Sequence, residues 1–141
     1  MSIPRLALRF RELTPGVDTV ASHNLIIKKQ GYTWWGWWKK QTEPDRTKDL
    51  RILKECIISA HRLEALLIDT SAERMHRAII VDIHTGKLSE PEKLRVPKYY
   101  RDVADVAAWF KVTSIIADVP YEIPVENSIG PNTMITFLDH A

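Results

Sequence analysis

Short apolar runs recur along the chain and are separated by turn signals. Over residues 6–10, leucine and phenylalanine alternate with alanine and arginine, a pattern that predicts a half-buried β-strand ending before a Pro-Gly turn. Residues 17–29 then have apolar positions near helical spacing. Lys28 and Lys29 are favourably placed in the last turn of this helix, and Gly31 is a stop signal. The chain is therefore expected to begin with a strand and a helix.

A second helix is expected after the aromatic segment of residues 32–40. Thr42 can cap its first turn, where the missing N–H of Pro44 does no harm, and the helix should run to about His61. Most of its charged side chains lie opposite one apolar stripe. That stripe consists of Leu50, Leu53, Ile57 and Ala60.

The second half of the chain has the pattern of β-strands. Residues 64–70 and 75–83 are apolar, β-branched runs joined by a connection of hairpin length. The polar stretch that follows contains prolines and is expected to be a loop. Residues 108–116 and 133–138 predict two more strands. In the first of these, alternation places Phe110, Val112 and Ser114 on one face, and Trp109, Lys111, Thr113 and Ile115 on the other.

The order of these elements predicts an α+β fold. Strand, helix, strand, helix and then several strands is not a regular βαβ alternation. We expect a small curved mixed β-sheet or barrel of five to six strands with two or three packed helices. At 141 residues the chain suits a single domain over residues 1–141 that folds without staples. It also suits one domain of a longer polypeptide.

Four of the five tryptophans stand within residues 32–40. If this segment is extended, Trp34 and Trp38 share one face while Trp35 and Trp37 share the other. One pair can be buried in the core, and the other would line the surface or a cleft, where an indole beside an ammonium group suits a nucleobase. The strand register decides which pair is which. If Trp34 and Trp38 are core, their replacement by alanine should cost roughly 3 to 5 kcal/mol, whereas Trp35→Ala or Trp37→Ala should abolish binding with only a modest loss of stability.

Cations stand next to the aromatic segment. Lys39 and Lys40 follow Trp38 directly and would meet the phosphate of a bound ligand. The formal charge of +2 and the pI near 8.7 are only mildly basic, so local clusters must decide whether nucleic acid binds. A solvated surface charge is the alternative for each further cation near the site. These rim candidates are Lys28, Lys29, Arg46, Lys98 and Arg101.

Metal, disulfide and phosphate-loop chemistry have no support in the sequence. Cys56 is the single cysteine, which excludes an internal disulfide and a multi-thiolate metal site. The histidines lack a His-x-x-x-His spacing, and His23 is more typical of a boundary residue than of a general base. A Gly-rich phosphate loop is also absent. We therefore expect no metal and no cofactor.

The chain is expected to be cytoplasmic. Its apolar runs are far shorter than a bilayer-crossing segment, and the N-terminus lacks the apolar core of a signal peptide. We therefore expect no membrane contact.

The order of the elements resembles the PUA-like superfamily, in particular its EVE, YTH and ASCH branches. The similarity lies in the early strand and helix, the Trp-rich segment, the strand pair at residues 65–69 and 79–83, and Tyr99-Tyr100 followed by Trp109-Phe110-Lys111-Val112. The resemblance implies a small β-barrel that holds a nucleobase, often a modified one, between the early tryptophans and the later strands. The Gly-Asp pair common before the central strand of EVE and ASCH domains is absent, since residues 60–64 read Ala-His-Arg-Leu-Glu.

We expect a noncatalytic reader of a nucleobase, in nucleic acid or as a free nucleotide, acting as the sensor part of a larger system with an effector domain or partner protein. The candidate ligand-binding residues are Trp34, Trp35, Trp37, Trp38, Lys39, Lys40, Trp109 and Lys111.

Two alternatives remain open at this point. The chain could be a hydrolase of a modified nucleoside or nucleotide, because some ASCH relatives are hydrolases. The groups for such chemistry would be Lys39 or Lys40, Thr33 or Thr42, and Glu43. Otherwise it could be a protein-interaction module that uses the tryptophans as a contact patch.

Overall fold

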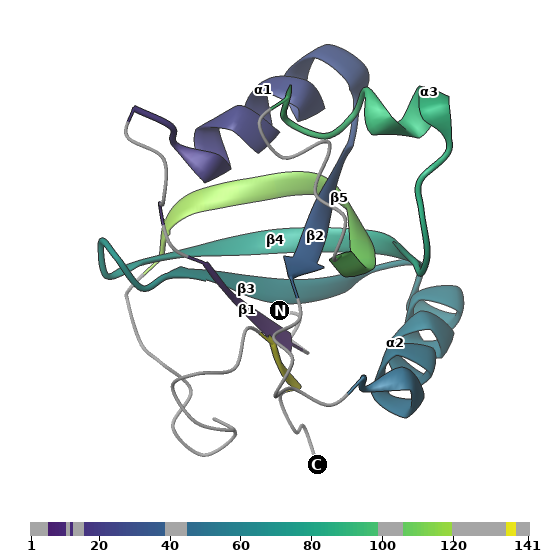
Figure 1. Ribbon diagram of the computed structural model, residues 1–141. Helices are drawn as coiled ribbons and strands as arrows, with labels where there is room; N and C mark the ends of the chain where they lie inside the picture. The colour runs from purple at the N-terminus through teal and green to yellow at the C-terminus, as the bar shows by residue number, and fades with distance from the viewer. Residues whose placement is uncertain are drawn as a thin grey trace.

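The computed structural model describes residues 6–10, 12, 16–38, 45–98, 106–119 and 135–137 (Figure 1). Strands and helices alternate in the first half of the chain, and strands predominate in the second half. In chain order they are β1 (Leu6–Phe10), α1 (Thr19–Gln30), β2 (Thr33–Trp38), α2 (Thr47–Ala60), β3 (Leu63–Asp69), β4 (Arg74–His84), α3 (Glu90–Lys93), β5 (Val106–Val119) and β6 (Ile135–Phe137).

The strands of the described part form one mixed sheet in the order β2-β5-β4-β3-β1-β6. β1 and β3 are parallel, and every other neighbouring pair is antiparallel. The parallel pair is possible because α1, β2 and α2 lie between its strands and supply the long crossover. Figure 1 shows β3, β4 and β5 curving side by side, with α1 and α2 on different sides of the molecule. The predicted α+β fold with a small curved mixed sheet is confirmed.

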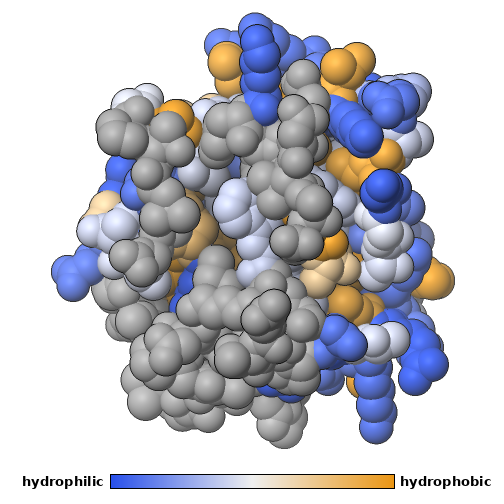
Figure 2. Space-filling model, viewed as in Figure 1, coloured by the Kyte–Doolittle hydropathy of each residue, from blue (hydrophilic) through white to orange (hydrophobic). Residues whose placement is uncertain are grey.

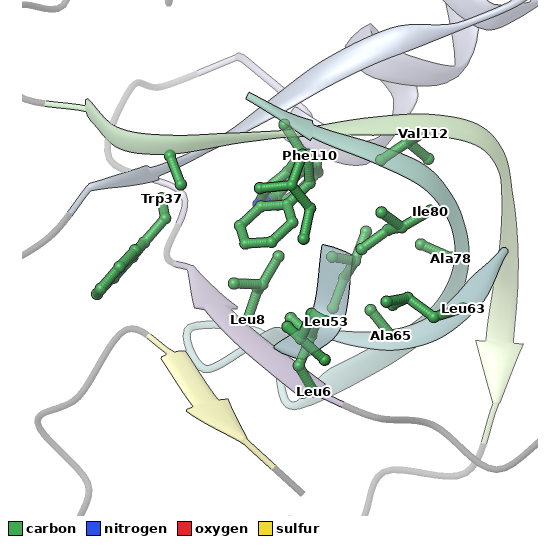
Figure 3. Close-up of a cluster of buried hydrophobic side chains, with 14 of the residues drawn as sticks. Leu6, Leu8, Trp37, Leu53, Leu63, Ala65, Ala78, Ile80, Phe110 and Val112 are labelled. Carbon is green, nitrogen blue, oxygen red and sulfur yellow. The ribbon is translucent and has the colours of Figure 1, made fainter. Parts of the chain in front are cut away.

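The main core lies inside the curve of the sheet. Side chains from β1 to β5 and from α1 and α2 belong to one apolar cluster. Figure 3 shows Leu8 of β1, Ile80 of β4 and Phe110 of β5 converging within it. Strands that are far apart in the strand order can share one cluster only if the sheet curls around it, which gives the half-barrel shape.

The predicted hairpin and last strand are confirmed. β3 and β4 pair antiparallel through a tight connection, with Ala65 opposite Ala78 in the core. β6 occupies residues 135–137 and pairs with β1. The strand at the edge of the sheet next to β1 is therefore the last one in sequence.

β1 is more deeply buried than its alternating pattern predicted. All five of its residues are buried, including Arg9, because β1 lies between β3 and β6. Its outward-facing Ala7 belongs to a second small apolar cluster with Leu66, Ile68 and Met75. The expectation of a half-buried strand was wrong because both faces of the sheet are covered here.

Alternation along β5 is interrupted by a bulge. Phe110 and Val112 face the main core together, but Ile115 lies in the same cluster and not on the opposite face. Consecutive residues of β4 pair with Val112 and Ser114, which leaves Thr113 as an extra residue. The extra residue reverses the alternation beyond it, and the predicted face of Ile115 was wrong for that reason.

Helix α1 begins at a capping side chain and ends at a glycine. Asp18 accepts a hydrogen bond from the backbone N–H of Ala21 at 2.9 Å and caps the helix. Gly31 ends it in the left-handed region with φ of 91°, a conformation that favours glycine. The predicted stop at Gly31 is confirmed, with Lys28 and Lys29 in the last turn.

The second helix begins later than predicted. It starts at Thr47, because Arg46 has φ of 58° in the left-handed region and cannot continue a helix backwards. The predicted cap at Thr42 lies outside the described residues. The apolar stripe is confirmed at Leu50, Leu53 and Ile57, whereas Ala60 is exposed.

A short helix, α3, occupies part of the polar stretch expected to be a loop. Ser89 stands at its N-cap and its backbone carbonyl accepts from the N–H of Lys93 at 3.0 Å. A single turn has no apolar periodicity to find in the sequence, and Pro91 is acceptable only because it stands in that first turn. The loop expectation was therefore wrong for residues 90–93.

Candidate ligand-binding site

The two faces of β2 carry different indole rings, as predicted from its alternation. Trp35 pairs with Phe110 of β5 and packs in the main core with Trp37. Trp34 projects to the other side of the sheet. The strand register had left the choice between the two pairs open, and the pairing with β5 turns Trp35 and Trp37 toward Phe110 and the main core.

Another apolar cluster, separate from the one that contains Ala7, lies on the outer face of β2 and β5. Trp34 and Trp109, each 5% exposed, are buried there with Leu88 and Val96. Partly buried side chains of Tyr32, Trp38 and Val106 pack against them. We call the four aromatic side chains of this face, Tyr32, Trp34, Trp38 and Trp109, the outer aromatic cluster.

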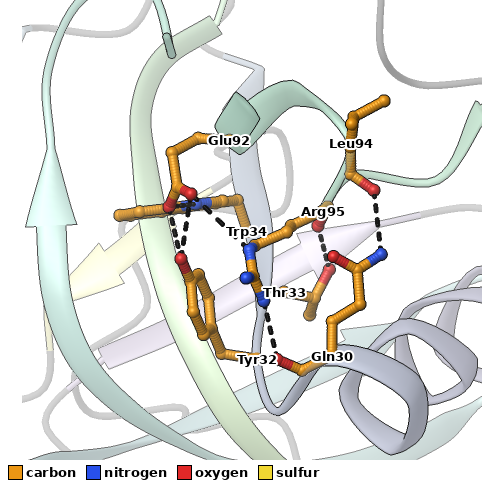
Figure 4. Close-up of polar contacts among 7 residues, drawn as sticks. All are labelled: Gln30, Tyr32, Thr33, Trp34, Glu92, Leu94 and Arg95. Atoms are coloured by element: carbon orange, nitrogen blue, oxygen red, sulfur yellow. Dashed lines mark hydrogen bonds and ion pairs between the residues drawn. The ribbon is translucent and has the colours of Figure 1, made fainter. Parts of the chain in front are cut away.

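The segment of residues 88–97 covers this cluster, and we call it the covering segment. Its Arg95 carbonyl accepts two hydrogen bonds from β2, from the Thr33 hydroxyl at 2.6 Å and from the Trp34 backbone N–H at 3.1 Å. The side chain of Gln30 donates to the carbonyl of Leu94 at 3.5 Å. The covering segment is thus tied to the end of α1 and to the start of β2 (Figure 4).

The carboxylate of Glu92 joins the covering segment to the aromatic rings. It accepts from the Tyr32 hydroxyl at 2.6 and 2.9 Å and from Trp34 Nε1 at 3.1 Å. The guanidinium of Arg95 lies 3.5 Å from it, measured from Nε to Oε2. The hydrogen bond from Tyr32 is the main reason that the pKa of Glu92 is lowered from its ordinary value, with smaller contributions from Trp34, Arg95 and Lys111.

Two cations flank the Tyr32 ring. Arg95 Cζ and Lys111 Nζ each lie 4.1 Å from the ring centroid, a cation–π distance. Partial burial, followed by the hydrogen bond to Glu92, raises the pKa of the Tyr32 hydroxyl, which stays protonated and donates.

The predicted ligand residues therefore divide into three groups. Trp34, Trp38 and Trp109 come together on the outer face, with Lys111 opposite Trp34 in the strand register. Trp35 and Trp37 lie in the main core. Lys39 and Lys40, together with the rim candidate Arg101, lie outside the described residues.

The other rim candidates are scattered. Lys28 and Lys29 are exposed at the end of α1, and Lys98 is exposed beyond the covering segment. Arg46 forms an ion pair with Asp49 at 3.4 Å next to α2, so its position is explained without a ligand.

One of the two hydroxyls considered for hydrolysis, that of Thr33, has a structural role. Thr33 is fully buried and its hydroxyl donates to the Arg95 carbonyl. The other groups considered for such chemistry, Lys39, Lys40, Thr42 and Glu43, lie outside the described residues.

Sequence reasoning missed Glu92 and Arg95. Both stand in a polar stretch without periodicity, and their partners Tyr32 and Trp34 are about sixty positions away in sequence. Nothing in the sequence next to a single glutamate indicates that its side chain contacts residues so far away in the chain.

His23 is not the boundary residue that its position on the helix predicted. It is fully buried, its Nδ1 donates to the Thr19 carbonyl at 2.7 Å, and its ring lies 4.5 Å from that of Trp35. Burial lowers its pKa from 6.5 to about 4. At neutral pH the imidazole is therefore uncharged and belongs to the core.

Metal ligands and membrane-spanning helices are absent from the part of the chain that the structure describes. No three His, Cys, Asp or Glu side chains of these residues are grouped so that they could hold a metal ion. Among the same residues, no helix is long and apolar enough to cross a membrane.

The family of the chain follows from its sequence as a whole. The Pua-like family model matches residues 6–128, a range that includes the helices of the described part and its strands β1 to β5. The chain belongs to the Pua-like family. No curated protein and no solved structure matches it. The narrower resemblance to EVE, YTH and ASCH domains stays a prediction.

Proposed function

We propose that this Pua-like domain is a noncatalytic reader that binds a nucleobase, in nucleic acid or in a nucleotide, at the outer aromatic cluster. The observation that carries the proposal is the presence of a second set of indole rings, Trp34, Trp38 and Trp109, on the face of β2 and β5 turned away from the main core. A stacked base gains roughly 1 to 3 kcal/mol from an aromatic plane.

The surroundings of the cluster suit a nucleotide. Arg95 and Lys111 bring two positive charges next to the Tyr32 ring. Tyr32 and Trp38 are only partly buried, so a planar ligand can approach the cluster at these two rings. Lys39 and Lys40 directly follow Trp38 in sequence and keep their proposed role at the phosphate.

The modified base implied by the family resemblance remains part of the proposal. An aromatic site selects such a base by shape and by stacking, as single-stranded bases are recognised in general. We also propose that the domain senses its ligand for an effector domain or a partner protein.

The contact-patch alternative is less well supported. Figure 2 shows hydrophobic side chains in small groups among hydrophilic ones on the visible face. The large apolar side chains that are exposed in the described part are aliphatic: Leu25, Ile52, Ile58, Leu94 and Ile116. The tryptophans are buried, or partly buried in the case of Trp38, so they do not offer the exposed indole patch that a protein hot spot would use.

The test is a titration of the protein with nucleosides, single-stranded and duplex oligonucleotides, with and without methylated bases. Intrinsic tryptophan fluorescence reports stacking, and anisotropy of a labelled oligonucleotide reports binding independently of the tryptophans. We expect saturable binding that Trp38→Ala weakens by about tenfold, the loss of one stacking partner.

Ile58→Ala is the matched control, because Ile58 is 72% exposed on α2, away from the outer aromatic cluster. It should bind as the unaltered protein does. Absence of saturable binding to every nucleoside and oligonucleotide would contradict the proposed function.

A further inference from the structure

Three donor groups contact one carboxylate where β2, β5 and the covering segment meet, and the ammonium of Lys111 lies over the ring of one of these donors, Tyr32. The Tyr32 hydroxyl and Trp34 Nε1 donate to Glu92. The Arg95 guanidinium forms an ion pair with it, and the charge of Lys111 acts on it as well. A hydroxyl, an indole N–H, a guanidinium and an ammonium are all groups that bind the oxygens of a phosphate.

We propose that these donors form an oxyanion-binding site that Glu92 occupies in cis, and that a phosphate group of the ligand displaces the Glu92 carboxylate. The inference rests on the proposed function only where it assigns the phosphate to a nucleotide or a nucleic acid.

The donors are held in place by contacts other than those with Glu92. Arg95 Nη1 donates to the Gln30 carbonyl at 2.6 Å, and Arg95 and Lys111 each form a cation–π contact with the Tyr32 ring. Trp34 is fixed by its pairing with Lys111 in the strand register. The site therefore keeps its geometry when the carboxylate leaves, which lowers the cost of ordering it around another anion.

Charge favours the exchange. Arg95 and Lys111 each carry one positive charge, and the Glu92 carboxylate carries one negative charge. A phosphate monoester carries between one and two negative charges at neutral pH and offers three acceptor oxygens. The side chain of Glu92 is 29% exposed, so an anion from solvent can reach its position.

Displacement of Glu92 also affects the outer aromatic cluster. Its bonds to Tyr32 and Trp34 are among the contacts that hold the covering segment over the rings. Their loss leaves the backbone contacts of Arg95 in place but loosens the turn that carries Glu92. Phosphate binding would thus make the Trp34 ring more accessible to a base. The affinity for a nucleotide should then exceed the value expected from the separate affinities for its base and for phosphate.

The test compares Glu92→Gln with Glu90→Gln. Both substitutions remove one negative charge from α3, but the Glu90 side chain is 87% exposed and does not contact the rings. Inorganic phosphate is titrated into each protein, followed by tryptophan fluorescence and calorimetry. We expect Glu92→Gln to bind phosphate about tenfold more tightly than the unaltered protein, and Glu90→Gln to differ by less than about twofold.

Equal phosphate affinities of the two variants would overturn the inference. A second measurement covers the case in which Glu92→Gln does not fold. The affinity of a nucleoside 5′-monophosphate is divided by that of its nucleoside, in the unaltered protein and in Lys111→Met. The ratio should exceed one in the unaltered protein and fall toward one in the variant, and an unchanged ratio overturns the inference.

The two proposals can fail separately. If nucleosides bind but neither phosphate measurement responds, the base site stands and the oxyanion site is wrong. If no nucleoside binds while Glu92→Gln gains affinity for phosphate, the oxyanion site stands and the proposed reader function is wrong.

Discussion

On the inner face of β2, Trp35 and Trp37 contact apolar side chains supplied by strands and helices from the whole domain, whereas on the outer face Trp34 lies beneath one short segment. The inner rings are held by apolar packing, apart from the stacked imidazole of His23. On the outer face Trp34 and Trp109 also pack in an apolar cluster, but Tyr32 and Trp34 donate in addition to Glu92, a contact that water and anions can replace. Similar burial of the indoles therefore conceals different surroundings, the main core on the inner face and one short covering segment on the outer face.

The largest difference between the faces should appear when one indole is removed from each. Trp35→Ala should lower the free energy of unfolding by roughly 3 to 5 kcal/mol, because it leaves a cavity beside Phe10 and His23. Trp38→Ala should cost about 1 to 2 kcal/mol, since its ring is only partly buried. Chemical denaturation of the two variants measures this. Equal losses would show that the outer face is as essential to the fold as the inner one.

The inner face should also give the protein a dependence on pH. The pKa of His23 is about 4 in the folded protein against an ordinary value of 6.5, so the unfolded chain takes up its proton first. The contribution of neutral His23 is fully present above pH 6.5 and is lost as the pH falls from 6.5 toward 4. Between pH 7 and pH 5 the loss should be roughly 2 kcal/mol.

His23→Gln is the control for this effect, because glutamine has a similar size, can donate to the Thr19 carbonyl and does not titrate. Denaturation curves at the two pH values should differ by roughly 2 kcal/mol less for this variant than for the unaltered protein. A pH dependence that is the same in both proteins would assign the effect to other groups.

The comparison of the faces also shows how far the sequence alone could lead. Alternation along β2 predicted that its indoles project to two faces. Which pair enters the core depends on the face of β5 that lines the core, and that pairing joins residues far apart in the sequence. The bulge at Thr113 similarly reverses a face with no change in local pattern. Glu92 and Arg95 were missed because a polar stretch has no periodicity, although their contacts define the outer site.

On the outer face, loss of the Glu92 charge should have a smaller effect on stability than either change to the core. Glu92→Gln weakens charge-assisted hydrogen bonds from Tyr32 and Trp34, and partial exposure reduces their contribution to about 1 kcal/mol. Thermal unfolding measures the shift against Glu90→Gln, whose exposed side chain should contribute close to nothing. If Glu92→Gln lowered the stability as much as Trp35→Ala, Glu92 would be essential to the fold, and its carboxylate could not be exchanged for another anion.

The smallest effect on stability is expected at Lys111, one of the two cations that flank Tyr32, and the other, Arg95, should not be its equal. Lys111→Met keeps the apolar stem and removes one cation–π contact, which at a partly exposed site is worth about 0.5 to 1 kcal/mol. Arg95→Met removes the same kind of contact together with the hydrogen bond to Gln30 and the ion pair with Glu92, so its loss should be the larger. Thermal unfolding of both variants decides the order. If Lys111→Met were the more destabilising, the Lys111 ammonium would be needed for the stability of the fold. Its charge would then not be available to a ligand, and its proposed role in binding phosphate would lose its main support.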